Sequence, residues 1–323
     1  MNTVGAFALV AGGVVLLGTG AELLVRGAIA VARLARMSPA VIGLTIVAMG
    51  TSLPELTVGI TAAVKGSAAV GVGNVMGVNV FNICVVLGMA ALVQPMRVHS
   101  MAVRLEWPVM FLAAWQCLLL VRDGSLDRLE GAYFSIALLI FTAYVVRIAR
   151  ADVAGEEAKD MAEEVRVRTF YGRLVRVGPS LGLIAAGIVL LVVGGNVLLR
   201  GAVSLAHLIG LSERVIGLTV VSMGTGLPEV AASLAAARRG QSEMALGNVI
   251  GSNIMNVFGV LGAVAWIHPL DVNVAEVSRD VWWMVGVSAL LLPIMRRGYQ
   301  VSRGEGAFLL AVYGAYLLTL GIH

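Results

Sequence analysis

The chain has 323 residues, of which 59% are hydrophobic and only 13% are charged, and its mean hydropathy is +0.92. Soluble domains carry about 25% charged residues, so this composition excludes an ordinary soluble domain and indicates a protein that lies in a lipid bilayer. The formal net charge of +4 comes from basic residues between the apolar runs and gives no reason to expect a nucleic-acid partner.

Ten apolar runs of about the length that crosses a bilayer follow one another along the chain. They lie at about 4–26, 39–64, 68–93, 101–121, 128–149, 177–200, 212–237, 244–266, 277–296 and 304–321. Each run is too long and too continuous to be a strand of a membrane barrel. The sequence therefore predicts an all-α polytopic membrane protein with ten transmembrane helices.

A polar segment, residues 150–176, divides these runs into two sets of five. Its six acidic residues, at 152–164, precede four arginines at 166–176, which is typical of a solvated, partly helical linker. A regulatory cation site is the alternative, although the segment has no spaced ligand loop such as an EF-hand. Because five is odd, the second set must enter the membrane from the opposite side. We predict one five-helix repeat at 1–149, a linker at 150–176, and an inverted five-helix repeat at 177–323.

Basic residues are unevenly distributed between the two sides of the predicted membrane. The side that holds both termini collects six of the 23 Lys and Arg residues, and the other side collects the remaining seventeen. The positive-inside rule places the more basic side in the cytoplasm. We therefore predict that both termini lie outside and that the linker is cytoplasmic.

One motif in the first half of the chain recurs 174 positions later. GTSLPE at residues 50–55 returns as GTGLPE at 224–229, and GNVMGVNVFN at 73–82 returns as GNVIGSNIMN at 247–256. A carboxylate inside a membrane is costly and therefore indicates function. Matched segments interrupted by Pro and Gly in two halves are typical of a transporter's binding site. The function is predicted to lie in these segments.

Each proline of the motif leaves a backbone carbonyl without its helical partner. Pro54 has no N–H to donate to the carbonyl of Gly50, and Pro228 leaves the carbonyl of Gly224 in the same state. At membrane depth, such a carbonyl is tolerated only where protein, water or an ion satisfies it. A kinked helix with a protonated, hydrogen-bonded Glu is the alternative interpretation, which the duplication of the whole motif disfavours.

Oxygen-bearing side chains share helix faces with the two glutamates. Thr51 lies four residues before Glu55, and Thr225 lies four residues before Glu229. The following spans carry polar stripes at the same spacing: Asn74, Val78 and Asn82, and Asn248, Ser252 and Asn256. Hard oxygen donors suit Na⁺, Ca²⁺ or Mg²⁺, and two glutamates are neutralised by one divalent or two monovalent cations.

With these motifs, the chain resembles the sodium/calcium exchangers of the calcium/cation antiporter superfamily, in their prokaryotic form. The resemblance implies that spans 2, 3, 7 and 8 form the ion site and that the first and sixth spans slide together across the rest. It also implies a prokaryotic inner membrane and no cofactor besides the transported ions. The implied metal ligands are the acids Glu55 and Glu229, the hydroxyls of Thr51, Ser52, Thr225 and Ser252, the amides of Asn82 and Asn256, and the carbonyls of Ala48 and Ser222.

The chain departs from this family pattern at three positions. Gly226 and Val78 stand where the family usually has Ser, and Asn256 stands where many members have an acid. Both central glutamates and both threonines are retained. The resemblance therefore implies an intact Ca²⁺ centre with fewer ligands at the outer Na⁺ positions.

From these features we predict a secondary active antiporter that exchanges Ca²⁺ for Na⁺ by alternating access. Exchange of Ca²⁺ for H⁺, or another cation/proton exchange, is the first alternative because of the missing ligands. A passive cation channel and an intramembrane enzyme are less favoured; the sequence has no HExxH or paired-Asp motif. The predicted partners are Ca²⁺, with Na⁺ or H⁺, and the lipid bilayer.

Glu22, in the first span, is not explained by the repeated motif. Its counterpart 174 positions later is Asn196, and Arg26 lies one helical turn after it. The spacing predicts a local ion pair between Glu22 and Arg26, or a residue at the helix end.

Overall fold

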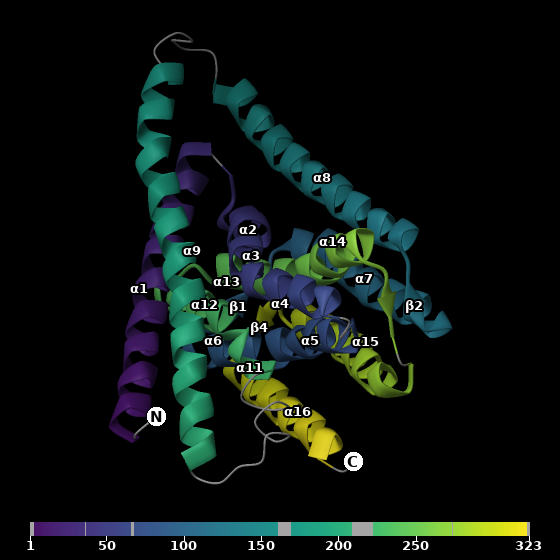
Figure 1. Ribbon diagram of the computed structural model, residues 1–323. Helices are drawn as coiled ribbons and strands as arrows, with labels where there is room; N and C mark the ends of the chain where they lie inside the picture. Colours follow the sequence, from purple (N-terminus) through teal and green to yellow (C-terminus); the bar gives the residue numbers. More distant parts are fainter. Residues whose placement is uncertain are drawn as a thin grey trace.

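The computed structural model describes residues 3–35, 37–65, 68–160, 169–208, 222–272 and 274–321, and this part of the chain is almost entirely helical (Figure 1). The long helices are α1 (Thr3–Ala35), α8 (Arg128–Asp160), α9 (Thr169–Leu208), α15 (Val274–Arg296) and α16 (Arg303–Gly321). The shorter helices are α2 (Pro39–Ile42), α3 (Ala48–Thr51), α4 (Leu53–Val64), α5 (Ala68–Phe81), α6 (Leu87–Val93), α7 (Trp107–Leu120), α11 (Ser222–Gly224), α12 (Leu227–Arg238), α13 (Ser242–Ile254) and α14 (Gly262–Ile267).

Several of the shorter helices continue into one another through irregular helical turns. Turns of π-helix lie at Gly43–Val47, Asn82–Val86, Ala102–Glu106 and Met255–Leu261, and a 3₁₀ turn lies at Val121–Asp123. Pro54 marks a sharper break, because α3 ends just before it and the axes on the two sides differ by 42°. Pro fits the first turn of a helix, where its missing N–H would have no helical partner.

Among the described residues, seven helical segments are long and apolar enough to cross a membrane, and the bent segment from α2 to α4 makes up to eight. The seven are Thr3–Ala35, Gly71–Val93, Ala102–Asp123, Arg128–Ala149, Gly178–Leu208, Ser242–Ile267 and Val277–Arg296. Of the other predicted runs, 212–237 begins outside the described residues and 304–321 coincides with α16. The protein is therefore a multi-pass membrane protein.

The helices α1 and α9 lie antiparallel along one side of the molecule and form a pair (Figure 1). Glycines at seven-residue spacing line their contact, and a Cβ on any of them would lie within 3.0 Å of the other helix's backbone: Gly13, Gly20, Gly27, Gly187, Gly194 and Gly201. The last three follow the first three by 174 positions. Small residues at such spacing allow membrane helices to approach closely, so the pair packs as one unit.

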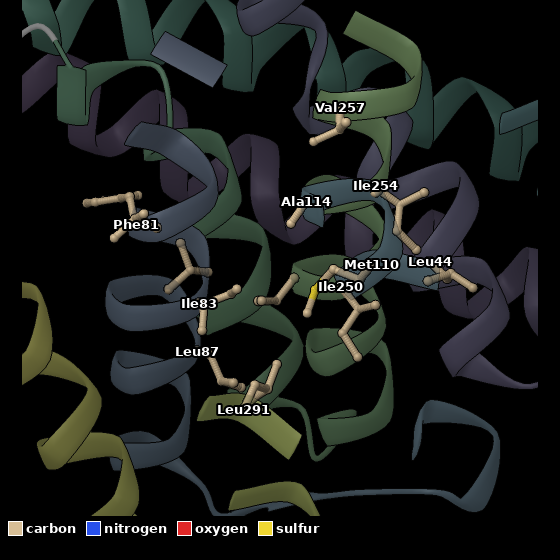
Figure 2. Packing of buried hydrophobic residues seen from close by; sticks show 14 of the residues in the cluster. Leu44, Phe81, Ile83, Leu87, Met110, Ala114, Ile250, Ile254, Val257 and Leu291 are labelled. Atoms are coloured by element: carbon tan, nitrogen blue, oxygen red, sulfur yellow. The ribbon is translucent and has the colours of Figure 1, made fainter. Parts of the chain in front are cut away.

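The other helices form a bundle beside this pair, with α13 at its centre. Every residue of α13 except Glu243 is buried. Figure 2 shows Ile250 and Ile254 of α13 packed among apolar side chains that include Leu44 and Met110. A helix that is buried on all sides lies inside a bundle, so polar side chains on α13 face protein and not lipid.

Short strands join loops from the two halves of the chain. The strands are β1 (Met96–Arg97), β2 (Ser125–Leu126), β3 (Leu270–Asp271) and β4 (Gln300–Val301). β1 pairs with β4, and β2 pairs with β3, both antiparallel. β1 and β3 are repeat counterparts, 174 positions apart, yet they belong to different two-stranded ribbons.

Helix extends far into the segment predicted as a linker. α8 continues to Asp160 and α9 begins at Thr169, so most of 150–176 is helical and residues 161–168 lie outside the described part.

Candidate functional site

The two motif glutamates lie at the starts of α4 and α12, inside the bundle. Glu55 and Glu229 are both 0% exposed and lie close enough for their charges to interact. The hydroxyl of Thr225 lies beside the Glu55 carboxylate, and the hydroxyls of Thr51 and Ser52 lie beside the Glu229 carboxylate. Glu55 thus has one hydroxyl of the other copy beside it, and Glu229 has two.

The proline-containing breaks position these groups. In both copies Pro occupies the second helical position and Glu the third, so each carboxylate lies in the first turn of its helix. The backbone closes the break in the same way twice, with Leu56 N–H donating to Ser52 and Val230 N–H donating to Gly226. A helix N-terminus carries partial positive charge that stabilises a carboxylate.

Polar side chains of α13 meet the first copy of the motif. The Thr51 Oγ1 lies 3.4 Å from both Asn248 Oδ1 and Ser252 Oγ, and it donates to the Ala48 carbonyl at 3.3 Å. Asn248 in turn donates to Ser233 Oγ at 3.0 Å. The second copy has a similar contact, in which the Thr225 hydroxyl donates to Asn74 Oδ1 at 3.4 Å.

A second polar group links α5 with the π-helical turn after α13. Asn256 Nδ2 donates to Asn79 Oδ1 at 3.1 Å, and Asn79 Nδ2 donates to the Asn253 carbonyl at 3.3 Å. Asn82 begins the π-helical turn after α5, and Asn256 lies in the turn after α13. π-Helical turns frequently lie at functional sites, and these two occur at repeat-related positions.

Several buried oxygens of this region have no hydrogen-bond partner. They are the Ser52 Oγ, both carboxylate oxygens of Glu55 and of Glu229, and the amide oxygens of Asn82, Asn253 and Asn256. Buried polar atoms are nearly always paired. Hard oxygens gathered in this way fit a Ca²⁺- or Na⁺-type cation.

The structure brings most of the predicted ligands to one region. Ala48 begins α3, and its carbonyl already accepts from both the Ser52 N–H and the Thr51 hydroxyl. Ser222 begins α11, and only its backbone position is described. Asn82 and Asn256 are fully buried. The predicted groups thus come from both halves of the chain.

Sequence reasoning missed three contributors to this network. Asn79 was given no role, although it is duplicated as Asn253, and that duplication was the available signal. Asn248 was recognised only as part of a polar stripe. Ser233, one turn after Glu229, has glycine as its repeat counterpart (Gly59) and gave no signal.

The departures from the family pattern are visible in the packing. A Cβ at Gly226 would lie 2.7 Å from the Phe81 ring, so a larger residue there requires that ring to move. Val78 is 1% exposed and presents methyl groups where its counterpart Ser252 presents a hydroxyl.

Comparison with known proteins identifies the family. The family described as sodium/calcium exchanger protein matches residues 5–147 and again residues 179–321. The chain belongs to the sodium/calcium exchanger family. It is 38% identical to CaxA of Alkalimonas amylolytica over 95% of this chain and 96% of CaxA. It is 29% identical to the sodium/calcium exchanger MaX1 of Methanosarcina acetivorans, over 95% of this chain and 96% of MaX1.

A solved member of this exchanger family has the same fold. The structure of the sodium-calcium exchanger NCX_Mj soaked with 10 mM Na⁺ and zero Ca²⁺ matches with a TM-score of 0.83 and 29% identity, covering 99% of this chain and 100% of NCX_Mj. The protein is therefore a membrane cation exchanger of this family, with two repeats and no enzymatic role.

Proposed function

We propose that this protein is a secondary active antiporter that exchanges Ca²⁺ for Na⁺ by alternating access. The observation that carries the proposal is the pair of fully buried glutamates. Each has at least one hydroxyl of the other repeat beside it, and each has two unpartnered oxygens. Two carboxylates without a cation are costly to hold inside a membrane protein. A bound cation that neutralises them therefore favours passage between two facing states, in which the site opens to one side of the membrane or to the other. This requirement couples the fluxes of the two cations.

The proposed ligand set is the one that the sequence predicts. The central ligands are Glu55, Glu229, Thr51 and Thr225, because the two acids and two threonines come together across the repeats. The outer ligands are Ser52, Ser252, Asn82, Asn256 and the carbonyls of Ala48 and Ser222. Ser52, Asn82 and Asn256 are favoured by their unpartnered oxygens.

The proposed architecture has ten membrane-spanning helices in two inverted five-helix repeats, at 1–149 and 177–323, joined by a cytoplasmic linker. The strand pairing supports the inversion: β1 and its repeat counterpart β3 belong to different ribbons, as expected if the two repeats cross the membrane in opposite directions. We propose that both termini lie outside an inner membrane, which follows from the distribution of basic residues.

Exchange of Ca²⁺ for protons is the second candidate function. It is favoured by the two positions where a family hydroxyl is missing, Gly226 and Val78, the first of which faces the Phe81 ring. With fewer neutral oxygen ligands for Na⁺, a proton on a carboxylate becomes the competing counter-ion.

Transport assays in proteoliposomes distinguish these functions. Uptake of labelled Ca²⁺ is measured with an outward Na⁺ gradient, with an outward proton gradient, and with neither. Ca²⁺/Na⁺ exchange requires the Na⁺ gradient, and Ca²⁺/H⁺ exchange requires the proton gradient. Uptake that needs no counter-ion on the far side would contradict both and indicate a channel.

A further inference from the structure

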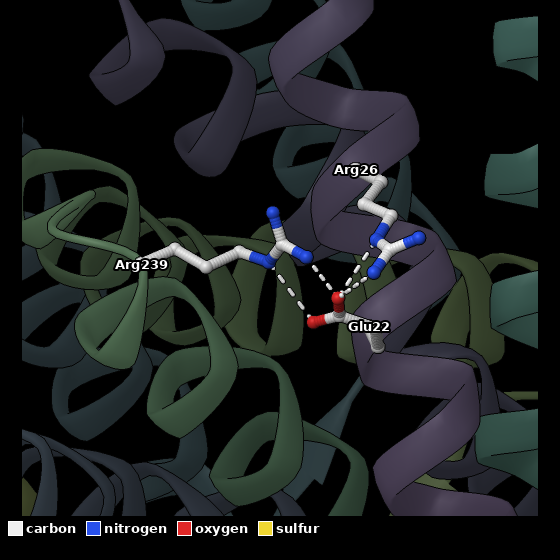
Figure 3. Close-up of polar contacts among 3 residues, drawn as sticks. All are labelled: Glu22, Arg26 and Arg239. Carbon is white, nitrogen blue, oxygen red and sulfur yellow. Dashed lines mark hydrogen bonds and ion pairs between the residues drawn. The ribbon is translucent and has the colours of Figure 1, made fainter.

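Glu22 forms an ion pair that reaches beyond its own helix. The Arg26 Nε donates to Glu22 Oε1 at 2.7 Å, as the sequence predicts. Arg239 adds a second partner: its Nε donates to Glu22 Oε2 at 2.9 Å, and its Nη2 contacts Glu22 Oε1. Figure 3 shows the Glu22 carboxylate between the two guanidinium groups, one from α1 and one from the loop after α12. Two-pronged Arg–carboxylate pairs have the most specific geometry among ion pairs.

This ion pair joins the α1–α9 pair to a helix of the candidate site. Arg239 directly follows α12, and its N–H bonds to the last turn of that helix. Glu229 lies in the first turn of the same helix. A continuous helix of this length transmits displacement from one end to the other. Any shift of α1 relative to Arg239 is therefore a shift relative to Glu229.

The repeat-related position cannot make the same contact. The counterpart of Glu22 is Asn196, and the counterpart of Arg239 is Lys65, which follows α4 as Arg239 follows α12. Asn196 donates to the Val192 carbonyl of its own helix. An amide cannot form an ion pair with a lysine, so the charge pairing is available to one repeat only.

The α1–α9 pair also lies asymmetrically against the two motif breaks. A Cβ on Gly50 would meet Ile188, and a Cβ on its counterpart Gly224 would meet Leu199, so both neighbours belong to α9. A symmetric arrangement would instead place Val25 of α1 at Gly50. Exchanging the roles of the repeats gives a second arrangement, in which Glu22 leaves Arg239 and Asn196 approaches Lys65.

We propose that Glu22 and Arg239 are positioning residues whose ion pair favours the arrangement described here over the repeat-exchanged one. This inference rests on the proposed alternating-access function, because the two arrangements correspond to the two facing states. An ion pair exposed to this degree is expected to shift such an equilibrium by about fivefold. It acts on the balance between the states and not on the cation ligands.

The test uses exchange of symmetry-related residues. Glu22→Asn gives both repeats the same residue, Asn196→Glu offers Lys65 an acidic partner, and the double variant transfers the pair to the other repeat. Arg26→Gln is the matched control, since it removes the partner within α1 and leaves Arg239 in place. Labelled Ca²⁺/Ca²⁺ exchange is measured in vesicles of defined orientation, saturating one side and titrating the other. The ratio of the half-saturating concentrations on the two sides follows the equilibrium between facing states.

We expect Glu22→Asn to change this ratio about fivefold, Asn196→Glu to change it in the same direction, the double variant to change it furthest, and Arg26→Gln to leave it within twofold. Normal exchange with an unchanged ratio in Glu22→Asn, or opposite shifts in Glu22→Asn and Asn196→Glu, would overturn the inference. The distance between spin labels at Phe7→Cys and Gln300→Cys follows the same equilibrium without transport. If the unaltered protein exchanges no Ca²⁺, the proposed function fails. The role of the ion pair is still supported in that case if Glu22→Asn shifts the distribution of spin-label distances. An unshifted distribution contradicts that role.

Discussion

The ring of Phe81 occupies the space that a side chain at Gly226 would need. A Cβ on Gly226 would lie 2.7 Å from Phe81 Cδ1 and Cε1, and the ring is held on another side by Tyr313, with centroids 5.6 Å apart. The repeat-related positions of Gly226 and Phe81 are Ser52 and Met255. The two repeat-related pairs thus differ at both residues. One combines a hydroxyl with a flexible thioether, and the other combines a glycine with a rigid ring.

This relationship changes what is expected from restoring the missing serine. Gly226→Ser alone should cost about 1–3 kcal/mol of stability, because overpacking a buried site forces neighbouring side chains to move. Gly226→Ser combined with Phe81→Met reproduces the repeat-related pair, Ser52 and Met255, and should recover that stability, because Met adapts its shape. Thermal unfolding of the purified variants measures both. Equal stability of the single and double variants would show that the ring does not restrict position 226.

The same double variant should steepen the Na⁺ dependence of Ca²⁺ uptake, because it adds a hydroxyl ligand to the cation site. Val78→Ser tests the other missing hydroxyl, since its counterpart Ser252 lies 3.4 Å from Thr51. The measurement is the Hill coefficient for Na⁺ in proteoliposomes. An unaltered coefficient in the double variant and in Val78→Ser would mean that neither position binds Na⁺.

Neutralising either central acid should abolish Ca²⁺ exchange. Glu55→Gln and Glu229→Gln keep the shape of the side chain and remove half of the charge that balances one Ca²⁺, so uptake should fall to the level of empty vesicles. Glu106→Gln is the matched control: Glu106 is buried, 1% exposed, but pairs with His99 away from the motif. Exchange close to normal in either central variant would refute the assignment of that acid.

Repetition made the central site predictable from the sequence, and its absence explains why the contacts of Glu22 with Arg239 and of Phe81 with Gly226 were not predicted. Glu55 and Glu229 could be paired because the whole motif recurs with them. The contact between Glu22 and Arg239 joins residues 217 apart with no repeated pattern, so only the spatial packing of α1 on α12 reveals it. The fit of Phe81 to Gly226 depends on side-chain packing across the two repeats and likewise has no sequence signal.

The pair formed by His99 and Glu106 predicts a pH-dependent stability. Burial disfavours the charged imidazole, but the hydrogen bond from His99 Nε2 to Glu106, 3.0 Å long, and the nearby charges of Glu106 and Glu243 outweigh it and raise the pKa of His99. The stabilisation is therefore fully present below the ordinary value of about 6.5 and is lost as the pH rises through the higher folded-state pKa.

Against His99→Gln, which cannot titrate, the unaltered protein should lose stability, and its unfolding midpoint should fall, as the pH rises from 6 to 9. Midpoints are measured in one detergent at constant ionic strength. A difference between the two proteins that does not change with pH would show that His99 keeps the same protonation state across this range.

Close packing of α1 on α9 should depend on the glycines that face the partner helix and not on glycine content. A Cβ on Gly20 would lie 2.8 Å from Leu191 N and 2.9 Å from the Gly187 carbonyl, whereas a Cβ on Gly18 meets nothing within 4 Å. Gly20→Ala should therefore separate the two backbones and destabilise the protein by about 1–3 kcal/mol. Gly18→Ala should be neutral or slightly stabilising, because Ala has the higher helix propensity.

Gly194→Ala, at the position related to Gly20 by the repeat, should behave like Gly20→Ala. Thermal unfolding compares the three variants, and a Gly20→Ala protein as stable as the Gly18→Ala protein would show that the helices of the pair are not held by direct backbone contact.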